Sequence, residues 1–568
     1  MSEISDSHVC GVKGKVIFKA PCLLSFTLIL LYTIVGILGC KNVNKVSDTL
    51  IFRYNEDASV STLDPAFVKS QSELWITSQI FNGLVELDSN LMPIPMIAKK
   101  WSIENNGLTY RFTLRNDVQF HGQERVGFKQ ARWVTAHDVV YSFQRLLNPE
   151  TASPGAWIFS DKVNLPKSHN LLDSNAAFYA PNDSVFVLKL KKPFAAMLSL
   201  LATAYCYIVP KEFVEDAKFQ FARNPIGTGP FYLKLWEEDV KLVLRKNAHY
   251  FEKEQGKPLP YLEAVNVDFI KNKQTAFMRF VAGEYDFFNG LEGSFKDELL
   301  SNKGELKPAF IGKIQLINKP FLNTEYLGFW VDSDLEKVDA LQNPHFRKAL
   351  NLAVDRAAIV RYLRNGMGYP AHAGFVPPVL NSKVVEGYCY SPTKAKEALK
   401  LAGYPLGKGA PVLSLTTTAD YLDMAVYVKK YWENIGIKVN IEVLTGGMLR
   451  QTRNKGKLPI FRGSWIADYA DAENYLACFY SKNHSPSGPN YTHYQSDKFD
   501  ALYEAIVAEL DFAKRQQLIY EADSLLMNDA PLLVLYYDKS IRLFQNHVHG
   551  LKNDVTNRLV LKRVWKSQ

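Results

Sequence analysis

The sequence lacks the residue spacings that usually mark a metal site, a redox centre or a hydrolase. Only 6 cysteines occur in 568 residues, and none form a Cys-x-x-Cys pair. The 11 histidines are scattered, without His-Glu-x-x-His or His-x-x-x-His spacing, and Gly-x-Ser-x-Gly does not occur. Each of these spacings serves a specific chemistry. We therefore expect no metal, no cofactor and no catalytic residues, and predict that the protein is not an enzyme.

Long runs of like charge are also missing. No Lys/Arg run reaches five residues, and the formal net charge of +9 is modest for this length. Nucleic-acid surfaces carry clustered basic residues, so we expect no nucleic-acid partner. Hydrophobic residues make up 47% and charged residues 22% of the chain, which is typical of a globular protein. The length allows roughly two to four domains with large buried cores.

One long apolar stretch stands near the beginning of the chain. Residues 20–38 carry no charge and follow Lys13, Lys15 and Lys19. Their end, Ile37-Leu38-Gly39-Cys40, resembles a bacterial lipobox, so we predict a lipoprotein signal peptide over residues 1–40 and lipidation at Cys40. An uncleaved membrane anchor is the alternative, because the stretch is near the length that spans a bilayer. Either way, the rest of the chain lies in the periplasm or cell envelope, on a membrane that the sequence does not identify.

The cysteines that remain after the signal peptide are odd in number. They are Cys206, Cys389 and Cys478. At most one disulfide is compatible with this count, and the spacing does not say which two residues would pair.

The second half of the chain has the pattern of a βαβ unit. Residues 413–417 and 437–443 have the character of strands, and residues 419–434 have that of a helix. We expect residues 460–465 to form the next strand of this mixed α/β lobe. Asp468 would then lie beyond a strand terminus, where open α/β sheets place their ligands.

Four residues around this strand end suit the recognition of a small charged ligand. They are Arg462, Trp465, Asp468 and Tyr469. A carboxylate binds an ammonium group through charge-assisted hydrogen bonds, and an indole gives a rigid apolar wall. The alternative is that Trp465 and Tyr469 belong to the core and that Asp468 pairs with Arg462.

The run Arg462-x-x-Trp465-x-Ala467-Asp468-Tyr469 resembles a segment of the bacterial oligopeptide-binding proteins, the family 5 extracellular solute-binding components of peptide ABC importers. Further matches occur in order at residues 63–65, 224–231 and 347–356, so the resemblance extends from about residue 50 to about residue 561. In that family the aspartate holds the α-ammonium group of the peptide, and the arginine also belongs to the site. The resemblance carries these roles to Asp468 and Arg462.

The resemblance implies an α/β, two-lobed periplasmic-binding-protein fold of the class II type, with mixed sheets, a hinge and an extra domain in the N-terminal lobe. The expected segments are lobe I over 41–90, the inserted domain over 91–215, lobe I again over 216–320, lobe II over 321–534 and a return to lobe I over 535–568. Trp157 in the inserted domain and Tyr536 in the returning strand are further candidates for ligand contact.

The implied function is the capture of short peptides between two lobes and their delivery to a membrane permease. The implied partners are peptides, the permease and ATPase subunits of an ABC importer, and the membrane through the lipid anchor; we expect a monomer. A nickel complex, haem or a glutathione-like ligand remains the alternative, because relatives with this fold bind them. A tryptophan of the oligopeptide binders has no match here, where Thr445-Gly446-Gly447 stands instead. The side-chain preference and the ligand length therefore stay open.

Overall fold

Two long antiparallel strands, β14 (Ile314–Phe329) and β19 (Leu532–Gln545), run through the middle of an 11-stranded mixed sheet. The computed structural model describes residues 50–122, 132–164, 175–290, 293–301, 303–332, 339–456, 458–552 and 555–567. All of them belong to one structural unit, Thr49–Gln568. The predicted signal peptide and the lipidation site at Cys40 lie outside the described residues.

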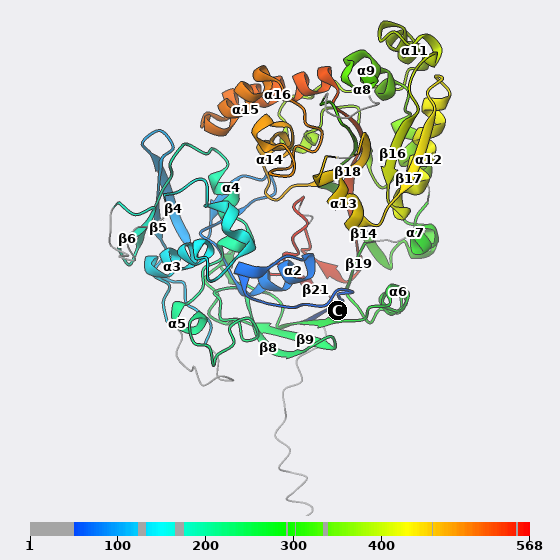
Figure 1. Ribbon diagram of the computed structural model, residues 1–568. Coiled ribbons are helices and arrows are strands. Elements are labelled where there is room, and N and C mark those ends of the chain that lie inside the picture. The colour runs from blue at the N-terminus through cyan, green and yellow to red at the C-terminus, as the bar shows by residue number, and fades with distance from the viewer. Residues whose placement is uncertain are drawn as a thin grey trace, which may run out of the picture. The chain divides into compact units, whose positions relative to one another are not determined.

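Lobe I is built on one end of this sheet (Figure 1). Its strands are β1 (Ile51–Asn55), β8 (Phe231–Glu237), β9 (Lys241–Lys246), β12 (Ala264–Asp268) and β13 (Phe287–Asn289). β1 pairs in parallel with β12 and β13, whereas β9 is antiparallel to both β8 and β12. Helix α2 (Gln71–Ile80) adds Trp75 to the aromatic core formed with Tyr54 and Phe287.

A separate four-stranded antiparallel sheet forms within residues 98–189. Its hydrogen-bonded order is β4 (Ala98–Glu104), β5 (Thr109–Leu114), β7 (Val185–Lys189) and β6 (Phe178–Asn182). Helix α3 (Ala136–Leu147) packs Phe143 against the sheet and begins with a capping box in which Asp138 accepts from the Thr135 N–H at 2.9 Å. This sheet falls inside the segment predicted as an inserted domain, whose boundaries stay a prediction.

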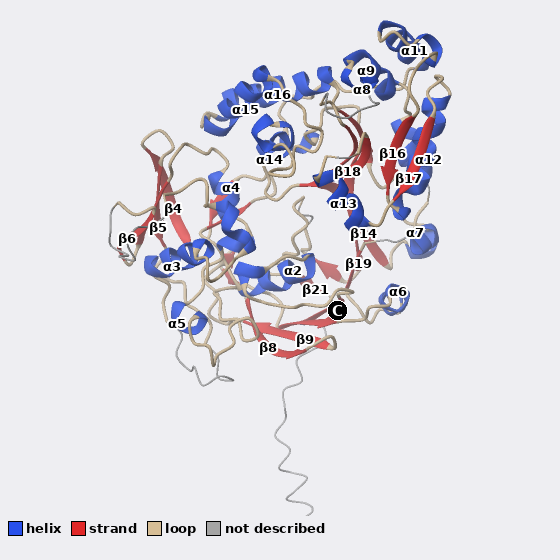
Figure 2. Ribbon diagram, in the orientation of Figure 1, coloured by secondary structure: helices blue, strands red, loops and turns tan. Residues whose placement is uncertain are grey.

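Lobe II is built on the other end of the large sheet. Strands β16 (Leu413–Thr417) and β17 (Val439–Val443) are parallel and joined by α12 (Leu422–Glu433), so the predicted βαβ unit is confirmed. Strand β18 (Ile460–Ile466) pairs in parallel with β16 and antiparallel with β14, giving the order β17-β16-β18-β14. Figure 2 shows helices packed around these strands.

Lobe II also contains several further helices. They are α9 (Pro344–Leu352), α11 (Pro392–Leu401), α13 (Gly446–Asn454), α14 (Ala472–Leu476), α15 (Asp497–Ala508) and α16 (Phe512–Asp529). Asn343 caps α9 and a proline occupies its first turn, where its missing N–H costs no helical hydrogen bond. Among the described residues, no helix has the length and apolarity needed to cross a bilayer.

The shorter elements connect these layers. They are β2 (Val85–Leu87), β3 (Pro93–Pro95), β10 (Lys253–Glu254), β11 (Lys257–Pro258), β15 (Tyr369–Pro370), β20 (Val548–His549), β21 (Trp565–Lys566), α4 (Met197–Leu201), α5 (Lys211–Val214), α6 (Lys273–Val281), α7 (Gly293–Leu299), α8 (Asp339–Gln342) and α10 (Arg356–Ala358).

The strands β14 and β19 pass from lobe I into lobe II. Residues 314–320 of β14 pair with 539–545 of β19, and residues 324–328 pair with 532–537, with a break in register between them. Such an irregularity lets a strand bend, so it marks the natural position of a hinge. The lobe II halves of these strands coincide with apolar runs at residues 326–331 and 531–537, whereas the lobe I halves are more polar.

The three cysteines of the described chain are free. Cys206 and Cys478 are buried and Cys389 is exposed.

Candidate ligand-binding site at the lobe junction

Asp468 lies just beyond the end of β18 and is oriented by Asn474. The Asp468 N–H donates to the Asn474 Oδ1 at 3.1 Å, and the Asn474 Nδ2 donates to the Asp468 Oδ2 at 3.3 Å. Asn474 is itself buried on the short helix α14. A capping Asp471 begins that helix and receives two hydrogen bonds from Arg515 of α16, at 2.9 and 2.7 Å. The carboxylate of Asp468 is therefore held from within lobe II.

The environment of Asp468 combines access to solvent with partial desolvation. Its side chain is exposed, yet crowding by surrounding protein raises its pKa above the ordinary aspartate value, and the hydrogen bond from Asn474 offsets this only in part. Among the described residues, no cationic side chain forms an ion pair with Asp468. The alternative pairing of Asp468 with Arg462 is not what the structure shows.

Trp465 belongs to the same hydrogen-bonded group. Its indole Nε1 donates to the Asn474 Oδ1 at 3.0 Å, and its ring packs partly buried against the core of lobe II. Asn474 thus fixes both the indole and the carboxylate that the sequence singles out. No motif in the sequence pointed to Asn474, because its role depends on a helix that folds back onto the strand end.

Tyr469 and Trp157 form a stacked pair. Their ring centroids are 6.0 Å apart with an interplanar angle of 26°. Trp157 lies in a short 3₁₀ helix, Pro154–Ile158, and is 37% exposed, while Tyr469 is buried. The Tyr469 hydroxyl donates to the Glu473 carboxylate, which also accepts from Tyr503. Burial and this neighbouring negative charge raise the pKa of Tyr469, so its phenol stays protonated.

A backbone hydrogen bond adds to this contact between the segments. The Ala195 N–H, beyond the four-stranded sheet, donates to the Val507 carbonyl of α15 at 2.8 Å. Leu322 and Ala470 also share an apolar cluster with Leu87 of lobe I. We call the region of these contacts around Trp157, Tyr469 and Asp468 the lobe junction.

Tyr205 is a junction residue that sequence reasoning missed. Its ring packs so closely on Gly155 that a Cβ there would lie 2.5 Å from it. Burial raises the pKa of Tyr205, and the charges of Asp468 and Glu73 raise it further. The only sequence signal was its position in an apolar stretch rich in aromatic residues.

Arg462 is tied to another acid rather than to Asp468. Its Nη2 donates to both oxygens of Glu325, at 2.7 and 2.6 Å, and its guanidinium lies 3.7 Å from the centre of the Tyr421 ring. Glu325 is almost fully buried, and this burial raises its pKa, whereas the charge of Arg462 lowers it. Arg462 is thus part of the strand framework next to the site.

Tyr536 has no exposed surface and packs in the lobe II core. The structure therefore gives it no ligand-facing surface, and it does not join the other candidates. Of the six predicted residues, Asp468, Trp465, Tyr469 and Trp157 meet at the lobe junction, and Arg462 lies on the adjoining strand.

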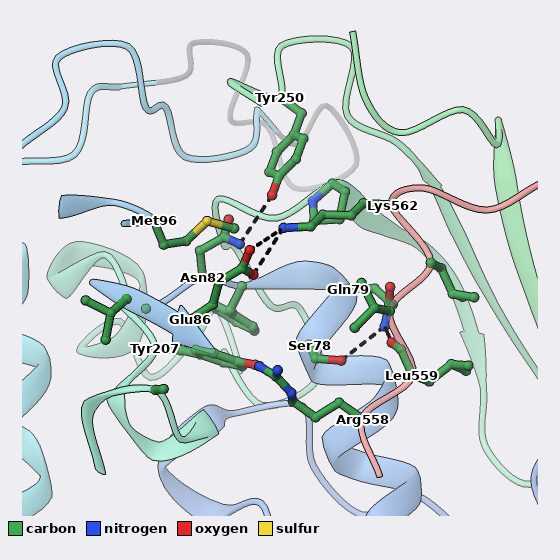
Figure 3. A pocket seen from close by; sticks show the side chains of 17 residues that line it. Ser78, Gln79, Asn82, Glu86, Met96, Tyr207, Tyr250, Arg558, Leu559 and Lys562 are labelled. Atoms are coloured by element: carbon green, nitrogen blue, oxygen red, sulfur yellow. Dashed lines mark hydrogen bonds and ion pairs between the residues drawn. The ribbon is translucent and has the colours of Figure 1, made fainter. Parts of the chain in front are cut away.

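A cavity of about 50 Å³ in lobe I contains none of these residues (Figure 3). Lys562 projects into it and donates to Glu86 at 3.0 and 3.1 Å and to Glu252 at 2.6 Å. The Gln79 amide donates to the Leu559 carbonyl at 2.7 Å. These contacts tie the C-terminal segment to α2 and β2, so the cavity has a structural explanation. Within the described chain, no group of three or more His, Cys, Asp or Glu side chains is placed to hold a metal ion.

Comparison with known proteins agrees with this architecture. Residues 92–487 match the model for bacterial extracellular solute-binding proteins, family 5. The chain is 27% identical over 530 residues to the periplasmic oligopeptide-binding protein OppA of Salmonella typhimurium, covering 90% of this chain and 91% of that protein.

Solved structures of similar proteins show the same fold. The unliganded open form of the murein tripeptide-binding protein MppA has a TM-score of 0.76 at 23% identity, covering 92% of this chain and 98% of that chain. The Helicobacter pylori binding protein DppA in complex with the peptide STSA has a TM-score of 0.68 at 26% identity, covering 91% and 98%. With a two-lobed mixed fold and a match over most of its length, the chain belongs to the family 5 bacterial extracellular solute-binding proteins.

Proposed function

We propose that this protein is the extracytoplasmic binding component of an ABC importer and that it captures short peptides at the lobe junction. The observation that carries the proposal is the carboxylate of Asp468, which is open to solvent, oriented by Asn474 and without a cationic partner among the described residues. A partly desolvated carboxylate without a cation is a receptor for an ammonium group. The similarity to oligopeptide-binding OppA supports a peptide as the source of that group.

The remaining contacts suit a ligand of variable sequence. Trp465 and Trp157 offer apolar surface, and the ring of Tyr205 packs on Gly155, two residues before Trp157. Strand β18 ends at the site, so the main chain of a peptide can hydrogen-bond alongside it as an added strand does. Binding would draw the two lobes together about the register breaks of β14 and β19.

The cellular context completes the proposal. A lipid on Cys40 would anchor the protein to a membrane, where it would deliver its ligand to permease and ATPase subunits as a monomer. The protein would act by binding alone, without catalysis. Mass spectrometry of the membrane-bound protein should find a chain that begins at an acylated Cys40; a chain that retains residues 1–39 would favour an uncleaved anchor.

Native mass spectrometry of the full chain in mild detergent tests the ligand class. We expect the protein as purified to carry heterogeneous added mass of a few hundred daltons that disappears after unfolding and refolding and that sequences as short peptides. A single discrete adduct or a bound metal would instead support a non-peptide solute. If a mixed peptide pool produced no mass shift on the refolded protein, peptide binding would be refuted.

A second measurement examines the role of the ammonium group. Free peptides and their N-acetylated counterparts differ only in the charge that Asp468 is proposed to bind. Isothermal titration should show that acetylation weakens binding by at least tenfold. Equal affinities would show that the ligand is not held through its α-ammonium group.

A further inference from the structure

Four charged side chains and two tyrosines meet where β14, β18 and β19 lie side by side. We call them the hinge cluster: Glu325, Arg364, Tyr421, Arg462, Tyr536 and Asp538. The strand register places Glu325 opposite both Ser464 of β18 and Tyr536 of β19. The cluster lies next to the register break of the crossing strands and shares β18 with the site at Asp468.

The charges of the hinge cluster balance in pairs. Arg462 binds Glu325 through two short contacts, and the Arg364 Nη2 lies 3.7 Å from the Asp538 Oδ1. Asn323 links the pairs, because its Nδ2 donates to Glu325 at 3.2 Å and to Asp538 at 2.9 Å. Two carboxylates thus face two guanidinium groups, and the formal charge of the cluster is zero. The nearby Lys539 is directed elsewhere, with its Nζ donating to the Gly366 carbonyl at 3.1 Å.

The charges of the cluster are all paired, but some of its buried polar atoms have no hydrogen-bond partner among the described residues. The Nε atoms of Arg364 and Arg462 and the hydroxyl of Tyr536 are buried, and the described residues provide no hydrogen-bond partner for them. An arginine Nε can only donate, so both of these nitrogens need an acceptor. Arg364 lies over the Tyr536 ring at 5.3 Å from its centre, which brings its spare donor close to the tyrosine. A buried donor without an acceptor is unfavourable, so both nitrogens would gain from an oxygen atom placed beside them.

The cluster is within reach of a ligand held at Asp468. The side chains of Arg364, Asp538 and Arg462 remain 34%, 19% and 16% exposed, so the cluster opens to solvent on the side of Arg364. Arg462 and Asp468 are six residues apart, a span of roughly 20 Å for extended chain. A peptide of at most about six residues, lying along β18 with its ammonium group on Asp468, would bring its far end to the cluster.

We propose that the hinge cluster receives a neutral carbonyl of the ligand, either a main-chain carbonyl or a carboxamide, and that Glu325 and Asp538 set this preference against a ligand carboxylate. This inference rests on the proposed peptide-binding function. The arginines supply donors, but each already faces an acid, so a third negative charge would be desolvated without a free cation to compensate it. A neutral acceptor satisfies the donors without that cost.

The test compares peptides that differ in one group. Alanine peptides of two to six residues are prepared as C-terminal acids and as C-terminal amides, and both series are titrated into the full chain in mild detergent. At the length that reaches the cluster, we expect the wild-type protein to bind the amide as tightly as the acid or up to tenfold more tightly. Glu325→Gln should shift this ratio at least tenfold toward the acid, because it frees Arg462.

Two further variants make the result interpretable. Asp538→Asn frees Arg364 at a more exposed position, so it tests the same idea if Glu325→Gln fails to fold. Glu252→Gln is the matched control, since it removes an acid that pairs with Lys562 at 2.6 Å in lobe I, and it should leave the ratio unchanged. A tenfold preference of the wild type for the acid at every length, or ratios in the cluster variants equal to the control, would overturn the inference. If neither series binds at any length, peptide binding itself fails and this inference with it.

Discussion

Trp157 stacks on Tyr469 across 312 residues of sequence, with ring centroids 6.0 Å apart. Trp157 lies in the segment predicted as an inserted domain, whereas Tyr469 follows a lobe II strand. The stack is one of the contacts that join these two segments. Its Tyr469 directly follows Asp468 in the sequence. If the lobes close on a ligand as proposed, this stack would help to hold the two segments together.

Trp157→Ala should weaken peptide binding moderately. Aromatic pairs contribute about 0.5–1.5 kcal/mol beyond the area they bury, which corresponds to a roughly 2- to 12-fold increase in Kd. Isothermal titration with one peptide measures the change. Trp133→Ala is a suitable control because Trp133 is also exposed, at 53%. If the two alanine variants bind equally well, the stack makes no contribution to closure.

Asp468→Ala should have a much larger effect. Removing one partner of a desolvated charged pair costs about 2–5 kcal/mol, or roughly 30- to 4000-fold in Kd. Asp468→Asn keeps the size of the side chain and should lose nearly as much affinity, whereas Asp497→Asn, on the surface of α15, should lose none. Binding of the alanine variant at the wild-type affinity would show that Asp468 does not hold the ligand.

Much of lobe II was predictable because its signals are local. Alternation over residues 437–443 and the amphipathic pattern of α12 each depend on neighbouring residues, and the structure confirms the unit. The lobe I half of β14 escaped prediction because Asn318, Lys319 and Pro320 interrupt its apolar pattern. Pairing with β19 stabilises that segment, and a partner more than two hundred residues away leaves no local trace.

The site residues also divide into those with a local sequence signal and those whose contacts come from distant parts of the chain. Asp468 and Trp465 stand out in one short run, but the residue that orients both is Asn474, six and nine positions further on. Arg462 also stands out in that run, yet its partner Glu325 is 137 residues away. No fixed sequence spacing predicts either contact, because each depends on how strands and helices pack after the chain has folded.

The pKa of Asp468 predicts an acid-sensitive affinity. Partial desolvation by the surrounding protein raises this pKa above the usual value of roughly 3.9, and only the ionised carboxylate attracts an ammonium group. Peptide affinity should therefore decline as the pH falls through the raised pKa, while the α-ammonium group stays protonated. Titrations of wild type and Asp468→Asn between pH 4 and 7 measure this, and the variant should show no such decline. A flat wild-type profile, or an equal decline in both proteins, would contradict the assignment.

Glu56 should make the stability of lobe I depend on pH. Its carboxyl is buried and, among the described residues, accepts a hydrogen bond only from the Ser72 hydroxyl, at 2.6 Å; this burial raises its pKa to about 8 from 4.5. The folded state thus binds a proton that the unfolded state has lost, so the contribution of Glu56 is fully present below about pH 4.5 and is lost as the pH rises to about 8. Across that window the free energy of unfolding should fall by up to roughly 1.4 kcal/mol per pH unit relative to Glu56→Gln, which cannot ionise.

Urea unfolding of both proteins at several pH values measures the difference, with the exposed Glu504→Gln as a control that should track the wild type. Parallel curves for wild type and Glu56→Gln would mean that Glu56 is ionised in the folded protein.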